Sequence, residues 1–230
     1  MPVCGACLSA IEPIAAEYFC ISCRTPFLNP YPLDEDGRCA LCRSGVRGFD
    51  WAACYGAYEG TLRELIHLYK YNRMRPLVKL LGDLLARALP REQSFDAVVA
   101  VPLHWRRQWE RGFNQSELLA RSIARRTGLP VLHPVRRRRA TRVQAGLSNA
   151  RRRENVAGAF VAKKAGAVKG LRILLIDDVM TTGATASACA HALKRAGAQS
   201  VALLTLARVD RRFVSPDKIA KPKGASAWPA

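Results

Sequence analysis

One stretch in the last third of the chain limits the fold more than any other part of the sequence. Leu171–Ile176 is a short, strongly apolar run, and Asp177 and Asp178 follow it directly. A loop rich in threonine and glycine comes next, and a helical pattern then runs from about Thr185 to Ala196. A buried strand that leads through a short loop into a helix is typical of a parallel α/β sheet, in which ligands bind beyond the carboxyl ends of the strands. The sequence therefore predicts an α/β fold with a ligand site at these two aspartates.

The chain after residue 48 repeats this alternation of short apolar runs and helical patterns. Helical spacing is found at 61–71, 76–89 and 115–126, and strand-like runs at 95–101, 131–135, 158–162 and 200–206. Such alternation predicts a mostly parallel sheet with helices on both faces. With 230 residues the chain is long enough for one such domain, which we expect over 49–209, with a small module over 1–48 and a flexible tail over 210–230.

The cysteines are concentrated near the N-terminus. Six of the eight form three C-x-x-C pairs within the first 42 residues, and two such pairs supply the four thiolates of a closed zinc site. Fifteen residues separate the second pair from the third, a spacing typical of a zinc ribbon, so we expect one structural zinc site at Cys20, Cys23, Cys39 and Cys42. Two explanations remain for Cys4 and Cys7: a mixed or partial site, or a further pair upstream of this starting methionine.

The charge balance indicates an anionic partner. The chain has 37 Lys and Arg against 18 Asp and Glu, a net charge of +19 with neutral histidines. Such an excess favours nucleic acid, a phosphorylated metabolite or an acidic lipid surface as a ligand. No apolar stretch reaches the roughly 20 residues that cross a bilayer. Glu12 and Glu17 interrupt the apolar part of the N-terminus, which argues against a signal peptide. We therefore expect a cytoplasmic protein with reduced cysteines.

The segment after Asp178 has the composition of a phosphate-binding loop. Gly183 lets the backbone curl so that N–H groups point inward, the start of the helix adds partial positive charge, and Thr181, Thr182 and Thr185 add hydroxyl groups. Two adjacent carboxylates repel phosphate, but they accept hydrogen bonds from vicinal hydroxyls. A phosphate loop beside such a diol acceptor fits a ribose 5-phosphate. The loop lacks the Gly-Lys-Ser/Thr of a Walker P-loop.

This stretch also resembles a known signature. Four apolar residues, two acidic residues and Val179-Met180-Thr181-Thr182-Gly183-Ala184-Thr185 resemble the 5-phosphoribosyl 1-pyrophosphate (PRPP) motif of type I phosphoribosyltransferases. Other motifs over residues 4–207 resemble the ComF family within that superfamily: Tyr69-Lys70-Tyr71, Val101-Pro102-Leu103-His104, Arg111-Gly112-Phe113-Asn114-Gln115, Gln144-x-x-Leu147-Ser148 and Arg152-x-x-Asn155-Val156.

The resemblance implies a type I phosphoribosyltransferase-like sheet flanked by helices, with a small N-terminal double zinc ribbon. It implies that PRPP binds with its 5-phosphate on Met180–Thr185 and its ribose hydroxyls on Asp177 and Asp178, whose charge would stabilise an oxocarbenium-like transition state. It also implies Mg²⁺ at the ribose and pyrophosphate, with pyrophosphate contacts from Lys70, Arg107 and Arg111. Members usually carry one more C-x-x-C pair, the first of the series, which favours the upstream start.

Arginine is concentrated in residues 104–153, which hold 14 arginines, no lysine and two glutamates. This is more charge than one pyrophosphate requires. Trp105, Trp109 and Phe113 nearby offer rings on which bases can stack, so single-stranded nucleic acid is a candidate ligand. The candidate contacts are two runs: Arg136, Arg137, Arg138 and Arg139, then Arg151, Arg152 and Arg153.

Two hypotheses of different classes therefore remain open. The first is an active phosphoribosyltransferase, a glycosyltransferase whose acceptor the sequence does not identify. The second is a non-enzymatic protein of DNA uptake, natural competence or recombination. Such a protein would bind single-stranded nucleic acid, contact other competence or recombination proteins, and keep its PRPP site as a sensor or relic. The association of the ComF family with DNA uptake favours that link by analogy only.

Overall fold

A computed structural model describes residues 3–44, 47–90, 92–139, 158–164 and 166–210, together with Val156 and Arg212. The sequence predictions for Arg151, Arg152 and Arg153, and for nearly all of 210–230, lie outside these residues. Within the described part of the chain, every helix is too short or too polar to cross a membrane.

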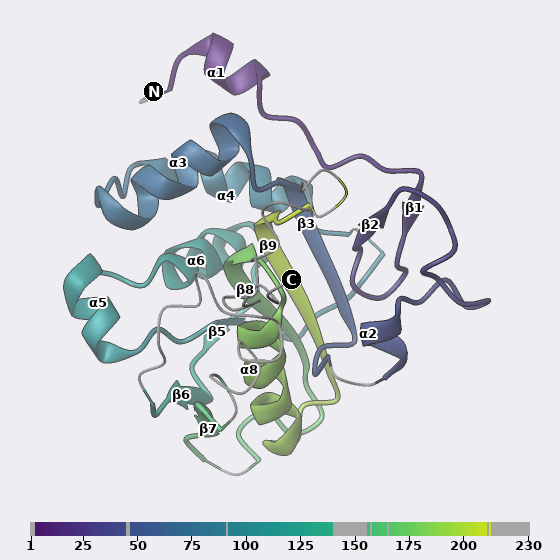
Figure 1. Ribbon diagram of the computed structural model, residues 1–230. Helices are drawn as coiled ribbons and strands as arrows, with labels where there is room; N and C mark the ends of the chain where they lie inside the picture. The colour runs from purple at the N-terminus through teal and green to yellow at the C-terminus, as the bar shows by residue number, and fades with distance from the viewer. Residues whose placement is uncertain are drawn as a thin grey trace, which may run out of the picture.

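The centre of the protein is a five-stranded parallel sheet (Figure 1). Its strands, in spatial order, are β3 (Trp51–Ala57), β9 (Ser200–Arg208), β8 (Arg172–Met180), β4 (Ala97–Ala100) and β5 (Val131–Leu132). The middle strands are rich in β-branched and leucine side chains that are buried on both faces, as expected of a sheet with helices on each side. This confirms the predicted α/β class.

Three helices cover one face of the sheet: α3 (Gly60–Tyr71), α4 (Leu77–Arg87) and α6 (Gln115–Thr127). Each presents an apolar stripe, and the stripe of α4 buries Leu77, Leu81 and Leu85 completely. Gly82 lies against Ser122 of α6, so the two helices approach closely. This packing fixes the start of α6, which the Asn114 side chain caps by accepting a hydrogen bond from the Ser116 N–H (3.1 Å).

The other face packs against α8 (Ala184–Arg195) and the cysteine-cluster part of the N-terminal module (residues 3–44), whereas Val3 and Ile11 of the module pack with the helices of the first face. The module contains α1 (Gly5–Ser9), an antiparallel pair β1 (Tyr18–Phe19) and β2 (Pro26–Phe27), and α2 (Ala40–Arg43). The buried Cys20, Cys23 and Cys39 belong to the same apolar core as α8. Arg208 at the end of β9 donates hydrogen bonds to the Cys23 carbonyl (2.8 Å) and to Thr25 Oγ1 (2.9 Å), which ties the module to the sheet.

The structure differs from the predicted elements in the region after β4. The predicted strand over 131–135 is two strands, because Pro134 has no N–H with which to continue the ladder: β5 ends at Leu132, and β6 (Val135–Arg137) leaves the main sheet. The predicted strand over 158–162 is β7 (Phe160–Ala162), which pairs antiparallel with β6 and not with the main sheet. Between residues 49 and 209, the sequence analysis also missed the strand β3 and the short helix α5 (Trp105–Arg111).

Candidate functional site

The carboxyl end of β8 leads directly into the candidate phosphate loop. Asp177 and Asp178 lie within β8, which ends at Met180, and α8 begins four residues later at Ala184. Gly183 has φ +77°, a conformation that glycine adopts without strain, and it forms the N-cap of α8. Thr182 Oγ1 accepts a hydrogen bond from the Ala184 N–H (3.3 Å). The first N–H groups of α8 thus gather at one turn, as in anion-binding helix starts.

A cavity of about 690 Å³ lies at this edge of the sheet. It brings together nine of the predicted PRPP-binding residues: Lys70, Arg111, Asp177, Asp178, Met180, Thr181, Gly183, Ala184 and Thr185. Of the other two, Thr182 lines a neighbouring cavity, and Arg107 lies in α5 with its side chain outside the described part. Residues more than 100 positions apart in the sequence thus meet at one end of the sheet.

Asp178 forms an ion pair with Lys70 of α3. The Lys70 Nζ is 2.9 Å from Asp178 Oδ1, and the two side chains are only 13% and 12% exposed. Burial alone would lower the pKa of Lys70, but the charge of Asp178 and their hydrogen bond outweigh burial and raise it. Lys70 is therefore a fixed positive charge next to the two aspartates.

Asp177 has a different environment from its neighbour. It accepts hydrogen bonds from Ser116 Oγ (2.9 Å) and from the Asp178 N–H (3.0 Å). Burial, and after it the negative charge of Asp178, raises the pKa of Asp177 to about 7, although Lys70 and Ser116 act in the opposite direction. The pair therefore combines a carboxyl group that is ion-paired with Lys70 and one that titrates near neutral pH.

Arg111 is fixed at the rim of the cavity by its neighbours. It donates hydrogen bonds to Gln115 Oε1 (3.2 Å) and to the Tyr71 hydroxyl (3.5 Å). Its guanidinium also lies over the Tyr71 ring, 5.0 Å from the ring centroid. The charge is held in place before any ligand arrives.

Ser116, Asn114 and Arg137 are among the residues of this cavity that sequence analysis did not assign to the PRPP site. Asn114 holds Ser116 at the start of α6 and also donates to the Val101 carbonyl (3.2 Å), so the two residues support Asp177 from the side. The N-cap pattern of Asn114 was the signal available in the sequence. Arg137 was predicted as part of one nucleic-acid-binding run, yet it lines this cavity and lies over the Phe160 ring.

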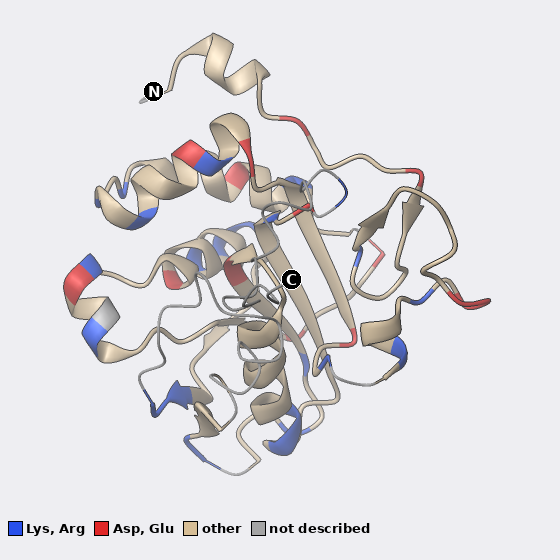
Figure 2. Ribbon diagram, in the orientation of Figure 1, with Lys and Arg blue, Asp and Glu red and all other residues tan. Residues whose placement is uncertain are grey.

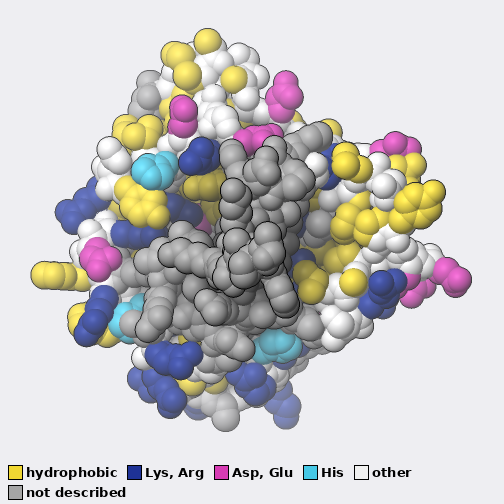
Figure 3. Space-filling view, viewed as in Figure 1, with side chains coloured by type: hydrophobic (Ala, Val, Ile, Leu, Met, Phe, Trp, Pro, Cys, Tyr) yellow, Lys and Arg dark blue, Asp and Glu magenta, His cyan; other side chains and the backbone are white. Residues whose placement is uncertain are grey.

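The remaining arginines of that run point elsewhere. Arg136, Arg138 and Arg139 are exposed: the two-residue period of a strand places Arg136 on the face opposite to Arg137, and Arg138 and Arg139 lie beyond the end of β6. On α5, Trp105 is 66% and Trp109 is 85% exposed. Basic residues colour α5, β6 and the end of α8 in Figure 2, and Figure 3 shows apolar and basic side chains side by side along the edge where α5 lies.

The N-terminal module contains a cluster of four cysteines: Cys20, Cys23, Cys39 and Cys42. Their sulfur atoms all lie within 4.8 Å of one another, and the Cys20–Cys42 and Cys23–Cys39 Sγ separations are both 3.7 Å. A tetrahedron with Zn–S bonds of about 2.3 Å has edges of about 3.8 Å. The cluster therefore fits zinc. Hydrogen bonds from the other cysteines, Cys20 first, lower the pKa of Cys23, and the charge of Arg47 lowers it further.

The first C-x-x-C pair lies apart from this cluster. Cys4 and Cys7 are exposed on α1, which lies near α3 in Figure 1 and away from α2. A hydrogen bond from Cys7 to Cys4 lowers the pKa of Cys4. The two thiols thus form a pair of their own at the surface.

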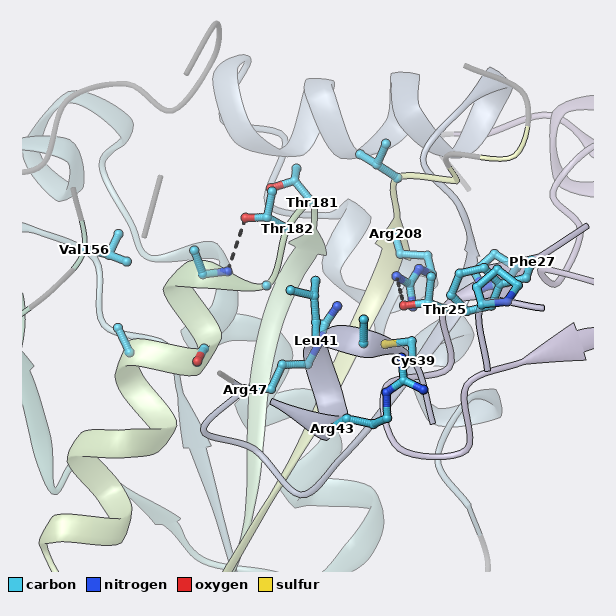
Figure 4. Close-up of a pocket in the computed structure, with 18 of the residues that line it drawn as sticks. Thr25, Phe27, Cys39, Leu41, Arg43, Arg47, Val156, Thr181, Thr182 and Arg208 are labelled. Atoms are coloured by element: carbon cyan, nitrogen blue, oxygen red, sulfur yellow. Dashed lines mark hydrogen bonds between the residues drawn. The ribbon is translucent and has the colours of Figure 1, made fainter. Parts of the chain in front are cut away.

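A second cavity, of about 820 Å³, lies between the N-terminal module and α8 (Figure 4). Its lining combines apolar side chains such as Phe27, Leu41 and Phe160 with arginines. It shares Thr181, Gly183 and Ala184 with the first cavity, so the phosphate loop borders both cavities.

Comparison with known proteins supports this geometry. Residues 114–224 match the model of a phosphoribosyl transferase domain family. The chain is 32% identical to the DNA utilization protein YhgH of Salmonella typhimurium, over 90% of each chain. It is 33% identical to competence protein F of Haemophilus influenzae, over 74% of this chain and 78% of the relative. It is also 30% identical to competence protein ComFC of Streptococcus pneumoniae, over 90% of this chain and 87% of the relative.

Proposed function

Because the chain belongs to the ComF family, we propose that it binds PRPP at the carboxyl edge of its sheet and transfers the 5-phosphoribosyl group to an acceptor. The relatives reported above are named for competence and DNA utilization. One observation carries the proposal. The carboxylate pair of β8, the turn at the start of α8, Lys70 and Arg111 all line a single cavity, and Lys70 is paired with Asp178. Diol acceptors, a phosphate loop and two fixed cations match the three parts of PRPP.

The proposed pose follows from the charges. The 5-phosphate lies on Thr181–Thr185, where helix N–H groups and hydroxyls donate to it. The ribose hydroxyls donate to Asp177 and Asp178. The pyrophosphate lies toward Arg111, whose planar guanidinium pairs with phosphate oxygens. Lys70, held by Asp178, adds positive charge near the ribose and the leaving group.

The proposed reaction is a substitution at C1 of the ribose. The bond from C1 to the pyrophosphate oxygen breaks, pyrophosphate leaves with the electron pair, and the acceptor atom forms a bond to C1 and loses its proton. Positive charge grows on the ring as the leaving group departs. The negative charge of Asp177 and Asp178 beneath the ribose stabilises that charge, and Arg111 stabilises the pyrophosphate. The acceptor remains to be identified.

Magnesium fits the residues present. Asp177 and Asp178 are two carboxyl groups beside the one cation of Lys70, so ionisation of both leaves a negative charge that a metal ion can neutralise. Carboxylates, ribose hydroxyls and pyrophosphate oxygens are the hard oxygen ligands that Mg²⁺ prefers. When bound, Mg²⁺ would neutralise charge on the leaving group. Zinc in the four-cysteine cluster would be structural, because four thiolates leave no position open for a substrate.

Calorimetric titration tests the proposal. Zinc-loaded protein is titrated with PRPP and Mg²⁺, and the titration is repeated with the D177N/D178N double variant. We expect micromolar binding by the wild type and its loss in the variant, because neutral amides lack the negative charge that strengthens hydrogen bonds from the ribose hydroxyls and attracts Mg²⁺. A folded wild-type protein that fails to bind PRPP would contradict the proposal.

We also propose a second function, favoured by the exposed rings of α5. Trp105 and Trp109 are far more exposed than tryptophan usually is, and Arg106 lies over the Trp105 ring. Exposed rings beside arginines suit single-stranded nucleic acid in a cytoplasmic role in DNA uptake or recombination, alongside other competence proteins. An oligonucleotide titration at several salt concentrations tests this. W105A/W109A should weaken binding, and D177N/D178N should not; equal affinity of the W105A/W109A variant and wild type would refute it.

A further inference from the structure

Arg47 is a buried cation with unmet hydrogen-bonding capacity. Its Nε and Nη1 atoms are both buried, and neither has a hydrogen-bond partner among the described residues. Its guanidinium lies 5.5 Å from the Phe49 ring centroid, and this contact cannot satisfy N–H groups in the plane of the guanidinium. Buried donors are normally paired, so these two indicate an acceptor other than the residues that the structure describes.

The position of Arg47 identifies where that acceptor would bind. A methyl group added to Gly183 would lie 2.9 Å from Arg47 Nη1, so the guanidinium stands directly against the phosphate loop. Arg47 also lines the second cavity with Thr181 and Thr182, and it lies beneath these two residues in Figure 4. Thr181 and Gly183 of the loop line both this cavity and the first one, which Lys70 lines, so Arg47 and Lys70 both lie beside the same loop.

The surroundings of Arg47 favour an anion. Five arginines line the second cavity, and none of its lining residues that the structure describes is an aspartate or glutamate: Arg43, Arg47, Arg195, Arg208 and Arg212. Arg47 also lies close enough to Cys23 for its charge to lower the pKa of that thiol. The thiolates are therefore the alternative partner, and the experiment below separates the two.

The backbone around Arg47 is held rigidly against α8. The Gly48 N–H donates a hydrogen bond to Ser187 Oγ (2.9 Å), and a methyl group on Gly48 would lie only 2.5 Å from the Ser187 carbonyl oxygen. Phe49, next in the sequence, packs beside Gly183. The segment Arg47–Phe49 therefore forms a strap across the first turn of α8, and Arg47 keeps its position without a ligand.

We propose that Arg47 binds the phosphate held by the Thr181–Thr185 loop, so that the N-terminal module completes the phosphate site of the α/β domain. This inference rests on the proposed function. The strap begins five residues after Cys42, the last cysteine of the cluster. Binding of zinc and binding of phosphate would therefore both hold the same short segment in place. Such coupling is reciprocal: phosphate should slow the loss of zinc, and loss of zinc should weaken phosphate binding.

Two ligands and three variants test the role of Arg47. Ribose 5-phosphate carries the 5-phosphate alone, whereas PRPP also carries pyrophosphate. We expect R47A to weaken both ligands by about tenfold or more, the usual effect of losing a hydrogen bond to a charged group. R47K, which keeps the charge, should recover part of the affinity. R111A should weaken PRPP but leave ribose 5-phosphate unchanged, because Arg111 stands at the pyrophosphate end.

Arg43 provides the matched control. It lines the same cavity, but it is exposed and pairs with Asp34 (3.9 Å), so R43A should bind ribose 5-phosphate as wild type does. Unchanged affinity of R47A, with normal zinc content and thermal stability, would overturn the inference while leaving the proposed function intact. A wild-type protein that binds neither ligand would overturn both.

Zinc release gives a readout that does not depend on turnover. We expect ribose 5-phosphate to slow the transfer of zinc from wild type to a chromogenic chelator, and to have no such effect on R47A. If R47A loses zinc faster than wild type but binds ribose 5-phosphate equally well, then Arg47 serves the thiolates and the phosphate role is wrong.

Discussion

The substitution Asp177→Asn tests the electrostatics of the site in the absence of any ligand. Burial, followed by the charge of Asp178, raises the pKa of Asp177 from 3.8 to about 7. A carboxyl group with a raised pKa in the folded state holds its proton more tightly there than in the unfolded chain. The stabilisation is therefore fully present below about pH 4 and is lost as the pH rises toward 7.

The magnitude follows from these two pKa values. Between pH 5.5 and 8 the linkage lowers the free energy of unfolding of the wild type by about 2 kcal/mol. Asparagine stays neutral over this range, and its carbonyl can still accept the hydrogen bond from Ser116. From pH 5.5 to pH 8, the free energy of unfolding of D177N should therefore rise by about 2 kcal/mol relative to that of the wild type. This corresponds to a relative rise in Tm of about 4–8 °C.

Urea unfolding of the zinc-loaded protein at pH 5.5, 7 and 8 measures this difference. A difference between D177N and wild type that stays constant with pH would refute the assigned environment of Asp177. The neighbouring substitution D178N is the control, because it should change the free energy of unfolding in the opposite direction. It leaves the buried Lys70 without its partner, and it should destabilise the protein by about 3–5 kcal/mol at neutral pH.

Three further predictions concern the ligand, the loop and the metal. Affinity for PRPP with Mg²⁺ should rise as the pH increases from 6 to 8, because the carboxyl group that titrates near 7 must lose its proton; identical binding enthalpies in buffers of different ionisation enthalpy would exclude this proton release. G183A should lose PRPP binding and about 1–2 kcal/mol of stability, because residue 183 has a positive φ and the added methyl group would contact Arg47. G158A is the control: residue 158 also has a positive φ, but it has open space around it, so this variant should bind PRPP normally. C39S should abolish the bound zinc measured by elemental analysis, and C7S should leave it unchanged; zinc lost from both would join the surface pair to the cluster.

The parts of the fold that the sequence predicted are those whose patterns are strong. The buried run of β8, the leucines of α4 and the glycine that ends α6 each act locally, so the sequence alone located them. The strand β3 was missed because alanine, cysteine and glycine have weak strand propensity, and only its pairing with β9 makes it a strand. The sequence analysis predicted β5 and β6 as one strand, although Pro134 between them lacks the N–H that would continue the ladder.

The candidate site likewise contains residues that the sequence could locate and residues that it could not. The loop and the aspartates are contiguous, so their shared chemistry was visible in the sequence. Ser116, Arg137 and Arg47 reach the loop from other elements, and each depends on tertiary packing that no local pattern encodes. The predicted domain boundaries at 48 and 209 stay predictions, and the strap at Arg47–Phe49 crosses the first of them.

The order of strands also constrains how the chain acquires this structure during synthesis. β3 leads out of the N-terminal module, and its one partner in the sheet is β9, which is made about 140 residues later. An emerging chain can therefore fold its cysteine cluster early, but β3 stays an unpaired edge until the last strand inserts between it and β8. A chain that ends before β9 would expose both strands to other chains, and it should aggregate rather than persist as a partly folded monomer.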